Sequence, residues 1–149
     1  MNKTILHTAI DLLSRREHSV KEIVNKLRQR AYAQEEIEQV IEYLLSNNYL
    51  CEQRFAESVF RSRINKGYGK RYIENELKQK GLASALISET EEHAAIDWYE
   101  LAQQSYHKKF GSSAIKDEKD KAKRIRFLQY RGFSTDEIFA AINMDEYLD

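Results

Sequence analysis

A pattern of residues that returns about every fifty positions constrains the fold of this chain more than any other feature. Leu27, Leu77 and Leu128 each open a short segment of mostly polar or basic residues that closes with a small residue and an apolar one. These leucines lie 50 and 51 residues apart, and each is followed ten positions later by an isoleucine: Ile37, Ile87 and Ile138. A fixed period of this length is typical of proteins that repeat one supersecondary unit. The sequence therefore predicts three tandem copies of one unit.

Each copy contains three segments in which apolar residues recur at helical spacing. Ile5, Ala9, Leu12 and Leu13 line one face of the first segment, and Ile37, Val40, Ile41, Leu44 and Leu45 line one face of the third. The chain has no proline and only five glycines, which favours helices joined by short turns. The predicted fold is all-α, with three-helix repeats at residues 1–50, 51–96 and 97–149 stacked into an elongated, curved body. A single compact helical bundle is the alternative.

Several helix ends can be placed from local signals. Ser19 with Glu22, and Ser134 with Glu137, have the spacing of a capping box. Asn48 tolerates the left-handed conformation that often follows a helix. The predicted structural joints are Gly67, Gly69, Gly81 and Gly132. The polar joint from Gly111 to about Glu118 is longer than its counterparts, so we expect it to be the most mobile loop.

Positive and negative charges are segregated along each repeat, although formal net charge is zero. The region of the second helix carries an excess of four, five and six positive charges in the three repeats, whereas the third helical segment of each repeat is acidic. In the last repeat its acidic residues are Asp136, Glu137, Asp145, Glu146 and Asp149. Attraction between helices is one explanation, and a surface for phosphates or an acidic protein is another. In a helix-turn-helix protein an acidic last helix would be repelled by DNA, which disfavours base-specific readout.

Motifs for catalysis, cofactors or metals are absent from the sequence. Gly67-Tyr68-Gly69 is not a nucleotide-binding loop of the Gly-x-Gly-x-x-Gly type, because Tyr72 stands where the third glycine would be. It also lacks the Gly-Lys-Ser/Thr ending of a P-loop. The four histidines are scattered, and Cys51 is the only cysteine. We therefore expect no enzyme, no cofactor and no metal. Without a signal peptide or an apolar span, the expected location is the cytoplasm. Tyr68 is either a contact residue or a packing residue.

Several segments resemble the RecX family along nearly the whole chain. They are Ala9 to Ser19, Asn48-Tyr49-Leu50 with Arg54-Phe55-Ala56, Lys66-Gly67-Tyr68-Gly69 with Ile73, Glu76-Leu77 and Lys80-Gly81, and Lys123 with Arg126-Phe127-Leu128 and Arg131-Gly132-Phe133. Three positions depart from the family pattern: Asn48 replaces glycine, Cys51 replaces the first residue of an acidic pair, and Lys70 replaces proline.

The resemblance implies a non-enzymatic modulator that binds filaments of the recombinase RecA on single-stranded DNA and limits their growth, ATP hydrolysis, strand exchange and co-protease activity. We expect a monomer that contacts DNA weakly through its basic helices. The candidate residues for contact with RecA or DNA are Arg61, Arg63, Lys66, Tyr68, Lys70, Arg71, Lys78, Lys123 and Arg126. The alternatives are a free-standing nucleic-acid-binding protein and a protein scaffold without nucleic acid.

Overall fold

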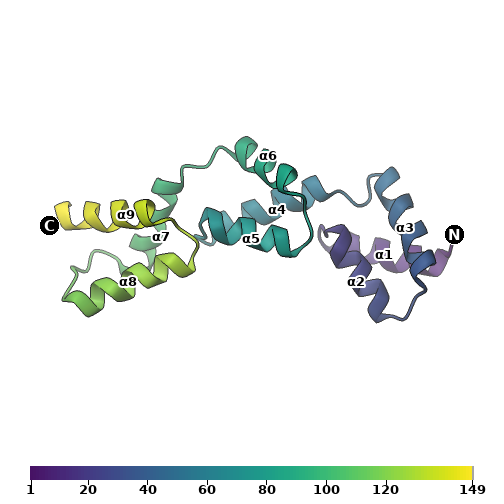
Figure 1. The fold of residues 1–149 in the computed structure, drawn as a ribbon, viewed down its shortest axis with the longest axis horizontal. Helices are drawn as coiled ribbons and strands as arrows, with labels where there is room; N and C mark the ends of the chain where they lie inside the picture. The colour runs from purple at the N-terminus through teal and green to yellow at the C-terminus, as the bar shows by residue number, and fades with distance from the viewer. Residues whose placement is uncertain (149) are drawn as a thin grey trace. The chain divides into compact units, whose positions relative to one another are not determined.

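A computed structural model describes residues 1–148 of the chain, and side chains as far as Asn143. Over this range the chain forms nine helices and no strand (Figure 1). They are α1 (Lys3–Arg15), α2 (Val20–Gln29), α3 (Gln34–Ser46), α4 (Glu52–Asn65), α5 (Lys70–Gln79), α6 (Ser84–Ala94), α7 (Trp98–Phe110), α8 (Glu118–Tyr130) and α9 (Thr135–Leu148). The prediction of an all-α chain with three helices in each repeat is confirmed. Asp145, Glu146 and Asp149, part of the predicted acidic end, lie outside the described side chains.

The helices begin and end where local chemistry satisfies their terminal backbone groups. The Ser19 amide donates to Glu22 Oε1 at 3.1 Å, and the Glu22 amide donates to Ser19 Oγ at 3.2 Å. Ser134 and Glu137 exchange the same two bonds at 2.9 and 3.2 Å. Both predicted capping boxes are therefore confirmed. Asn48, after α3, has a φ of 60°, the left-handed conformation predicted for it.

The chain divides into two compact units. One contains residues 1–58 and 77–90, and the other contains residues 59–76 and the chain from residue 91 onward. Helices α4, α5 and α6 each contribute residues to both units. These units are not the predicted repeats, whose boundaries at residues 50 and 96 stay a prediction.

The core of the first unit is an apolar cluster between α1, α2 and α3. It contains the predicted leucine and isoleucine of the repeat pattern, Leu27 and Ile37, both without exposed surface. Leu45 was predicted on the same buried face of α3, but 42% of it is exposed. Residue 45 follows the buried Leu44 by one position, or about 100° of helix rotation, which carries it away from the core.

A polar network beside this core surrounds the N-terminus of α2. His18 is 1% exposed, its Nδ1 lies 3.0 Å from the Arg16 carbonyl oxygen, and its Nε2 lies 3.0 Å from Lys26 Nζ. A neutral imidazole fits both contacts, with Nδ1–H donating and Nε2 accepting. Burial, followed by the positive charge of Arg16, lowers the pKa of His18. Protonation of His18 would therefore oppose folding.

Glu22 joins the same network. Arg16 Nη2 and Lys80 Nζ lie 3.0 and 3.2 Å from Glu22 Oε2. Burial raises the pKa of Glu22, but hydrogen bonds from Arg16, the Ser19 amide and Lys80 together outweigh burial and lower the pKa to about 2. The carboxylate of Glu22 therefore stabilises the fold at neutral pH.

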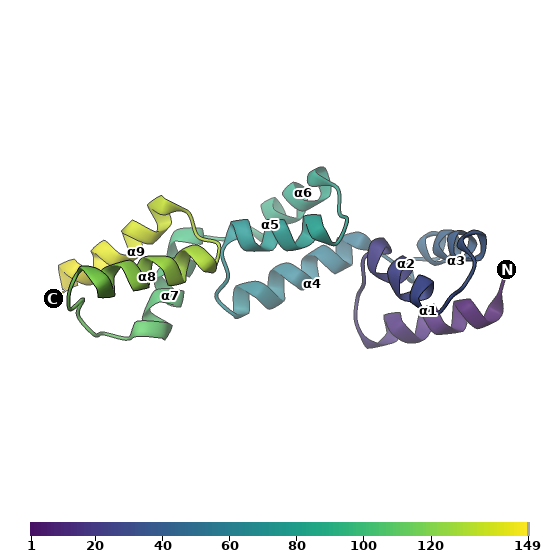
Figure 2. The same cartoon turned by 60° about the horizontal axis from the view of Figure 1, so that its bottom comes forward.

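In the second unit, α7, α8 and α9 pack around a core that includes Leu101, Tyr106, Leu128 and Ile138 (Figure 2). Arg124 of α8 lies inside this unit and is only 3% exposed. It donates to Tyr106 Oη at 2.8 Å, to the carbonyl oxygens of Ser113 and Ala114 at 2.9 and 3.2 Å, and to Asp120. Arg124 thus binds two carbonyl groups of the joint between α7 and α8, and the mobility expected of that joint stays a prediction.

Candidate partner-binding surface around Gly67–Gly69

The joint Gly67-Tyr68-Gly69 connects α4 to α5 and packs against the turn between α8 and α9. The Gly69 amide donates to the Arg131 carbonyl at 2.6 Å, and the Arg71 amide donates to the Gly132 carbonyl at 3.1 Å. A Cβ atom on Gly69 would lie 2.6 Å from the Gly132 carbonyl carbon, which is too close for any side chain. The two backbones therefore meet directly, and this contact fixes the position of the joint.

Tyr68 is half-buried in a stack of flat side chains. Its ring centroid lies 4.2 Å from that of Tyr72. The guanidinium carbons of Arg131 and Arg63 lie 4.5 and 5.7 Å from the Tyr68 centroid. Such aromatic and cation–π contacts each contribute about 0.5–1.5 kcal/mol. Of the two roles that the sequence left open for Tyr68, this geometry favours packing.

Arg63, predicted as a contact residue, is engaged within the protein. Its Nε and Nη2 donate to the two carboxylate oxygens of Glu76 at 2.7 and 3.2 Å. The hydrogen bond that Arg63 donates to Glu76 is the main cause that raises the pKa of Arg63. A forked pair of this kind fixes both side chains. Arg63 therefore holds α4 to α5 and presents the face of its guanidinium to Tyr68 and Tyr72.

Exposed cations surround this joint. Arg61, Lys66, Lys70 and Arg71 are all exposed, and Lys70 alone of these four has a carboxylate partner among the described side chains, with its Nζ 3.7 Å from Glu91. Arg61, Lys66 and Arg71 are thus the predicted contact residues in this part of the chain whose charge is available to a partner.

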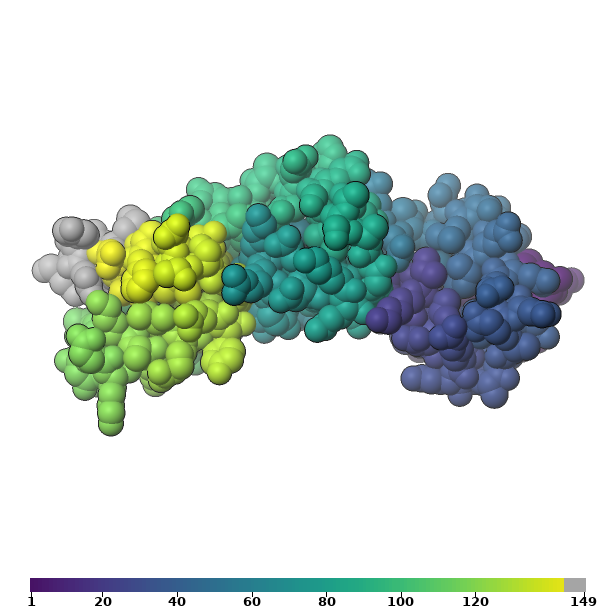
Figure 3. Space-filling view, in the orientation of Figure 1, coloured from purple at the N-terminus to yellow at the C-terminus, as the bar shows by residue number. Residues whose placement is uncertain are grey.

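The other predicted contact residues lie elsewhere. Lys78 is exposed near the end of α5, in the first unit. Lys123 and Arg126 are exposed on α8, whose side chains cover part of the surface of the second unit (Figure 3, light green). With Tyr130, which is 81% exposed, they follow helical spacing along one face of α8.

The structure corrects the assignment of positive charge to the second helix of each repeat. Arg15 lies on α1, Arg61 and Arg63 lie on α4, and Lys108 and Lys109 lie on α7, which are the first helices of the three repeats. Arg124 belongs to α8 but is buried. The sequence pattern missed these points because charge density along a chain does not reveal where one helix ends or which face is covered.

Arg131 was also missed as a candidate site residue. Its Nη1 donates to the Lys66 carbonyl at 2.7 Å, and its guanidinium lies 5.0 Å from the Phe127 ring centroid as well as over Tyr68. Its place directly before Gly132, in the third copy of the repeated pattern, was the signal available in the sequence.

Two classes of feature do not occur in the described residues. No group of three or more histidine, cysteine, aspartate or glutamate side chains is placed to hold a metal ion in this part of the chain. Within the same residues, no helix combines the length and apolarity needed to span a bilayer.

Comparison with known proteins assigns each part of the chain. Residues 6–44, 52–90 and 95–142 match the models of the first, second and third three-helix domains of RecX. A regulatory protein RecX of Vibrio campbellii is 43% identical over 93% of this chain and 89% of its own length, and one of Acinetobacter baylyi is 44% identical over 93% and 86%.

Solved structures share the fold. A crystal structure of regulatory protein RecX superposes with a TM-score of 0.82 at 23% identity, covering 95% of this chain and 72% of that one. A crystal structure of RecX from Lactobacillus salivarius gives 0.76 at 20% identity, covering 97% and 96%. With all three domains matched in order and relatives above 40% identity, the chain belongs to the RecX family.

Proposed function

We propose that this chain is a regulatory protein that binds RecA filaments on single-stranded DNA and limits their growth, and with it ATP hydrolysis, strand exchange and co-protease activity. One observation carries the proposal: the chain matches all three RecX domains, and its relatives at 38–44% identity are named regulatory proteins. It acts through binding and as a monomer, without catalysis or a cofactor.

The surface beside the Gly67–Gly69 joint suits this role. Arg61, Lys66 and Arg71 present positive charge that no described carboxylate neutralises. The joint behind them is held by backbone contacts and by the stack of Tyr68, Tyr72 and Arg131. Cations on a rigid support can meet the phosphates or acidic groups of a filament at little conformational cost.

A second candidate function is binding of free nucleic acid, and the exposed face of α8 favours it. Lys123 and Arg126 could contact phosphates there, and the exposed ring of Tyr130 could stack on a base. Such binding would be independent of RecA and strongly dependent on salt.

One titration separates the two functions. Fluorescence anisotropy of labelled single-stranded DNA is measured with this protein alone, and with RecA and ATP, at two salt concentrations. The regulatory function predicts much tighter binding to the RecA filament than to bare DNA. Equal, salt-sensitive binding to both would instead support the second function.

The contact surface is tested with matched charge reversals. Arg61→Glu with Arg71→Glu should weaken binding to the filament, because both side chains are exposed and have no carboxylate partner among the described residues. Arg63 is left unchanged, since its reversal would place a second carboxylate beside Glu76 and unfold the site. Lys3→Glu with Lys119→Glu changes the charge equally at exposed lysines outside the candidate contact residues and serves as the control. Undiminished filament binding by a folded Arg61→Glu, Arg71→Glu variant would remove this surface from the proposal.

A further inference from the structure

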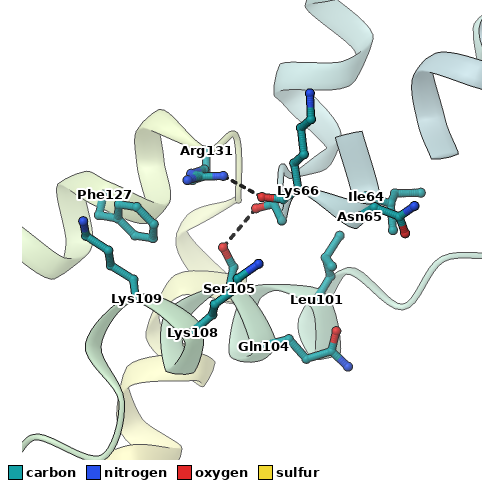
Figure 4. Close-up of a pocket in the computed structure, with 11 residues that line it drawn as sticks. Ile64, Asn65, Lys66, Leu101, Gln104, Ser105, Lys108, Lys109, Phe127 and Arg131 are labelled. Atoms are coloured by element: carbon teal, nitrogen blue, oxygen red, sulfur yellow. Dashed lines mark hydrogen bonds between the residues drawn. The ribbon is translucent and has the colours of Figure 1, made fainter. Parts of the chain in front are cut away.

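A hollow of about 310 Å³ lies in the second unit, where the end of α4, one face of α7 and the end of α8 meet (Figure 4). Sites for small molecules usually have volumes of about 300–1,000 Å³. The hollow therefore has room for one small ligand, or for one unit of a longer one.

The charge of the hollow is positive. Lys66, Lys108, Lys109 and Arg131 line it, and no aspartate or glutamate is among its lining residues. Within the described side chains none of these four cations pairs with a carboxylate. Figure 4 shows Lys66 extending away from α7, Lys109 reaching toward Phe127, and the ammonium group of Lys108 on the other side of Ser105. The flexible side chains of Lys108 and Lys109 can turn toward one bound anion. Like charges gathered at one place repel, and a bound anion would relieve that repulsion.

The hydrogen-bonding groups at the hollow favour a ligand that carries hydrogen-bond acceptors. The carbonyl oxygen of Lys66 already accepts from Arg131 Nη1 at 2.7 Å, and the carbonyl oxygen of Gly67 accepts from Ser105 Oγ at 3.0 Å (dashed in Figure 4). These two backbone acceptors are occupied within the protein. The ammonium groups of Lys108 and Lys109 supply donors, and an ammonium group has no acceptor. A phosphate, with charged acceptor oxygens only, is complementary to them.

The hollow also has an apolar wall. Leu101 and the half-buried ring of Phe127 line it together with the cations. Inorganic phosphate would leave this wall in water, whereas a nucleotide would place its sugar or base against it. We infer that the hollow binds the phosphate of a nucleotide, either a free nucleotide or one unit of a strand, with Lys108 and Lys109 as the donors. This site goes beyond the regulatory function because it requires no RecA.

The first test compares ligands that differ only in phosphate. Amide chemical shifts of the full-length protein are followed by NMR during titration with thymidine 5′-monophosphate, thymidine and a short oligothymidylate. Thymidine 5′-monophosphate should shift the amides from Ser105 to Lys109 and that of Gly67, and thymidine should not. Stronger binding of the oligothymidylate at the same amides would identify a strand as the source of the phosphate, and weaker binding would identify a free nucleotide. If neither phosphorylated probe shifts these amides, the inference is wrong.

The second test uses matched variants. Lys108→Gln with Lys109→Gln should weaken binding of the phosphorylated probe by about tenfold or more, since a hydrogen bond to a charged group contributes about one power of ten in affinity. Lys108→Arg with Lys109→Arg should retain binding. Lys3→Gln with Lys119→Gln removes the same charge at two exposed lysines outside the hollow and outside the candidate contact residues, and should leave affinity within about twofold. Circular dichroism establishes that each variant is folded. Equal losses of affinity in the two glutamine variants would show that the probe is attracted by overall positive charge and would overturn the inference. The titration with RecA tests the regulatory function separately and does not depend on this result.

Discussion

Replacing Gly69 by alanine should destabilise the second unit by about 3–5 kcal/mol. The added Cβ would lie 2.6 and 2.7 Å from the carbonyl carbon and oxygen of Gly132, and 2.7 Å from the Phe133 nitrogen. Carbon atoms in favourable contact lie about 3.5–4.0 Å apart. All three neighbours are backbone atoms, so no side chain can rotate to make room, and the two turns must separate.

The size of this destabilisation is the sum of two costs, the overpacking itself and the hydrogen bonds lost when the two turns separate. Overpacking costs about 1–3 kcal/mol. The bonds from the Gly69 amide to Arg131 and from the Arg71 amide to Gly132 would also be lost, at about 1 kcal/mol each. Gly132→Ala should be at least as damaging, because its Cβ would lie 2.5 Å from the Tyr72 nitrogen and its φ is +96°.

Trp98, the only tryptophan, packs against the core of the second unit and provides the assay. Its fluorescence is followed during urea unfolding of each variant. Gly111→Ala is the control for Gly132→Ala, since both glycines have a positive φ but Gly111 has nothing within 4 Å of its added Cβ. Gly111→Ala should lower the free energy of unfolding only by the cost of holding alanine in that backbone conformation, about 1–3 kcal/mol. If Gly69→Ala lies within about 0.5 kcal/mol of the unsubstituted protein, the direct backbone contact is refuted.

Three further predictions concern buried polar groups. Arg124→Ala should lower stability by about 3–5 kcal/mol and speed amide exchange in residues 111–117, and Arg124→Lys should not restore the forked contacts. The pKa of Glu22 is lowered, so its contribution to folding stability is present above about pH 4.5 and is lost as pH falls toward 2. Unfolding measurements should show an acid-dependent loss of about 1–2 kcal/mol that is absent in Glu22→Gln. His18 also has a lowered pKa, so stability should be complete above about pH 6.5 and fall below it, and His18→Gln should remove that slope.

Each of these predictions has an outcome that contradicts it. Unchanged exchange in residues 111–117 of Arg124→Ala would mean that another group holds the joint. Identical acid unfolding of Glu22→Gln and the unsubstituted protein would show that Glu22 is not paired in solution. Stability that does not change between pH 7 and 5 would show that His18 accepts a proton in the folded state without cost.

Helix ends could be predicted from the sequence because their chemistry is local. Ser19 and Glu22 lie three residues apart, and the backbone that joins them is the helix they cap. The core face of α3 was predicted as far as Leu44 for the same reason, since periodicity records one continuous face. The prediction that Leu45 is buried was wrong, because the sequence does not show which apolar residue is the last to face the core.

The candidate site could be predicted only in part, because its key contacts join distant residues. Tyr68 stacks on Arg131, and Lys66 bonds to Arg131 across 65 positions of sequence. Arg124 stands between Lys123 and Ile125 in a helix rich in exposed cations, and nothing local distinguishes it as buried. Which cations are available to a partner is decided by these tertiary contacts and not by composition.

The most direct test of the proposed function is the rate of ATP hydrolysis by RecA on single-stranded DNA as this protein is added. The account predicts that the steady-state rate falls with increasing protein, and that the folded Arg61→Glu, Arg71→Glu variant requires a higher concentration for the same effect. A rate that stays constant at every protein concentration, with filaments still forming normally, would contradict it.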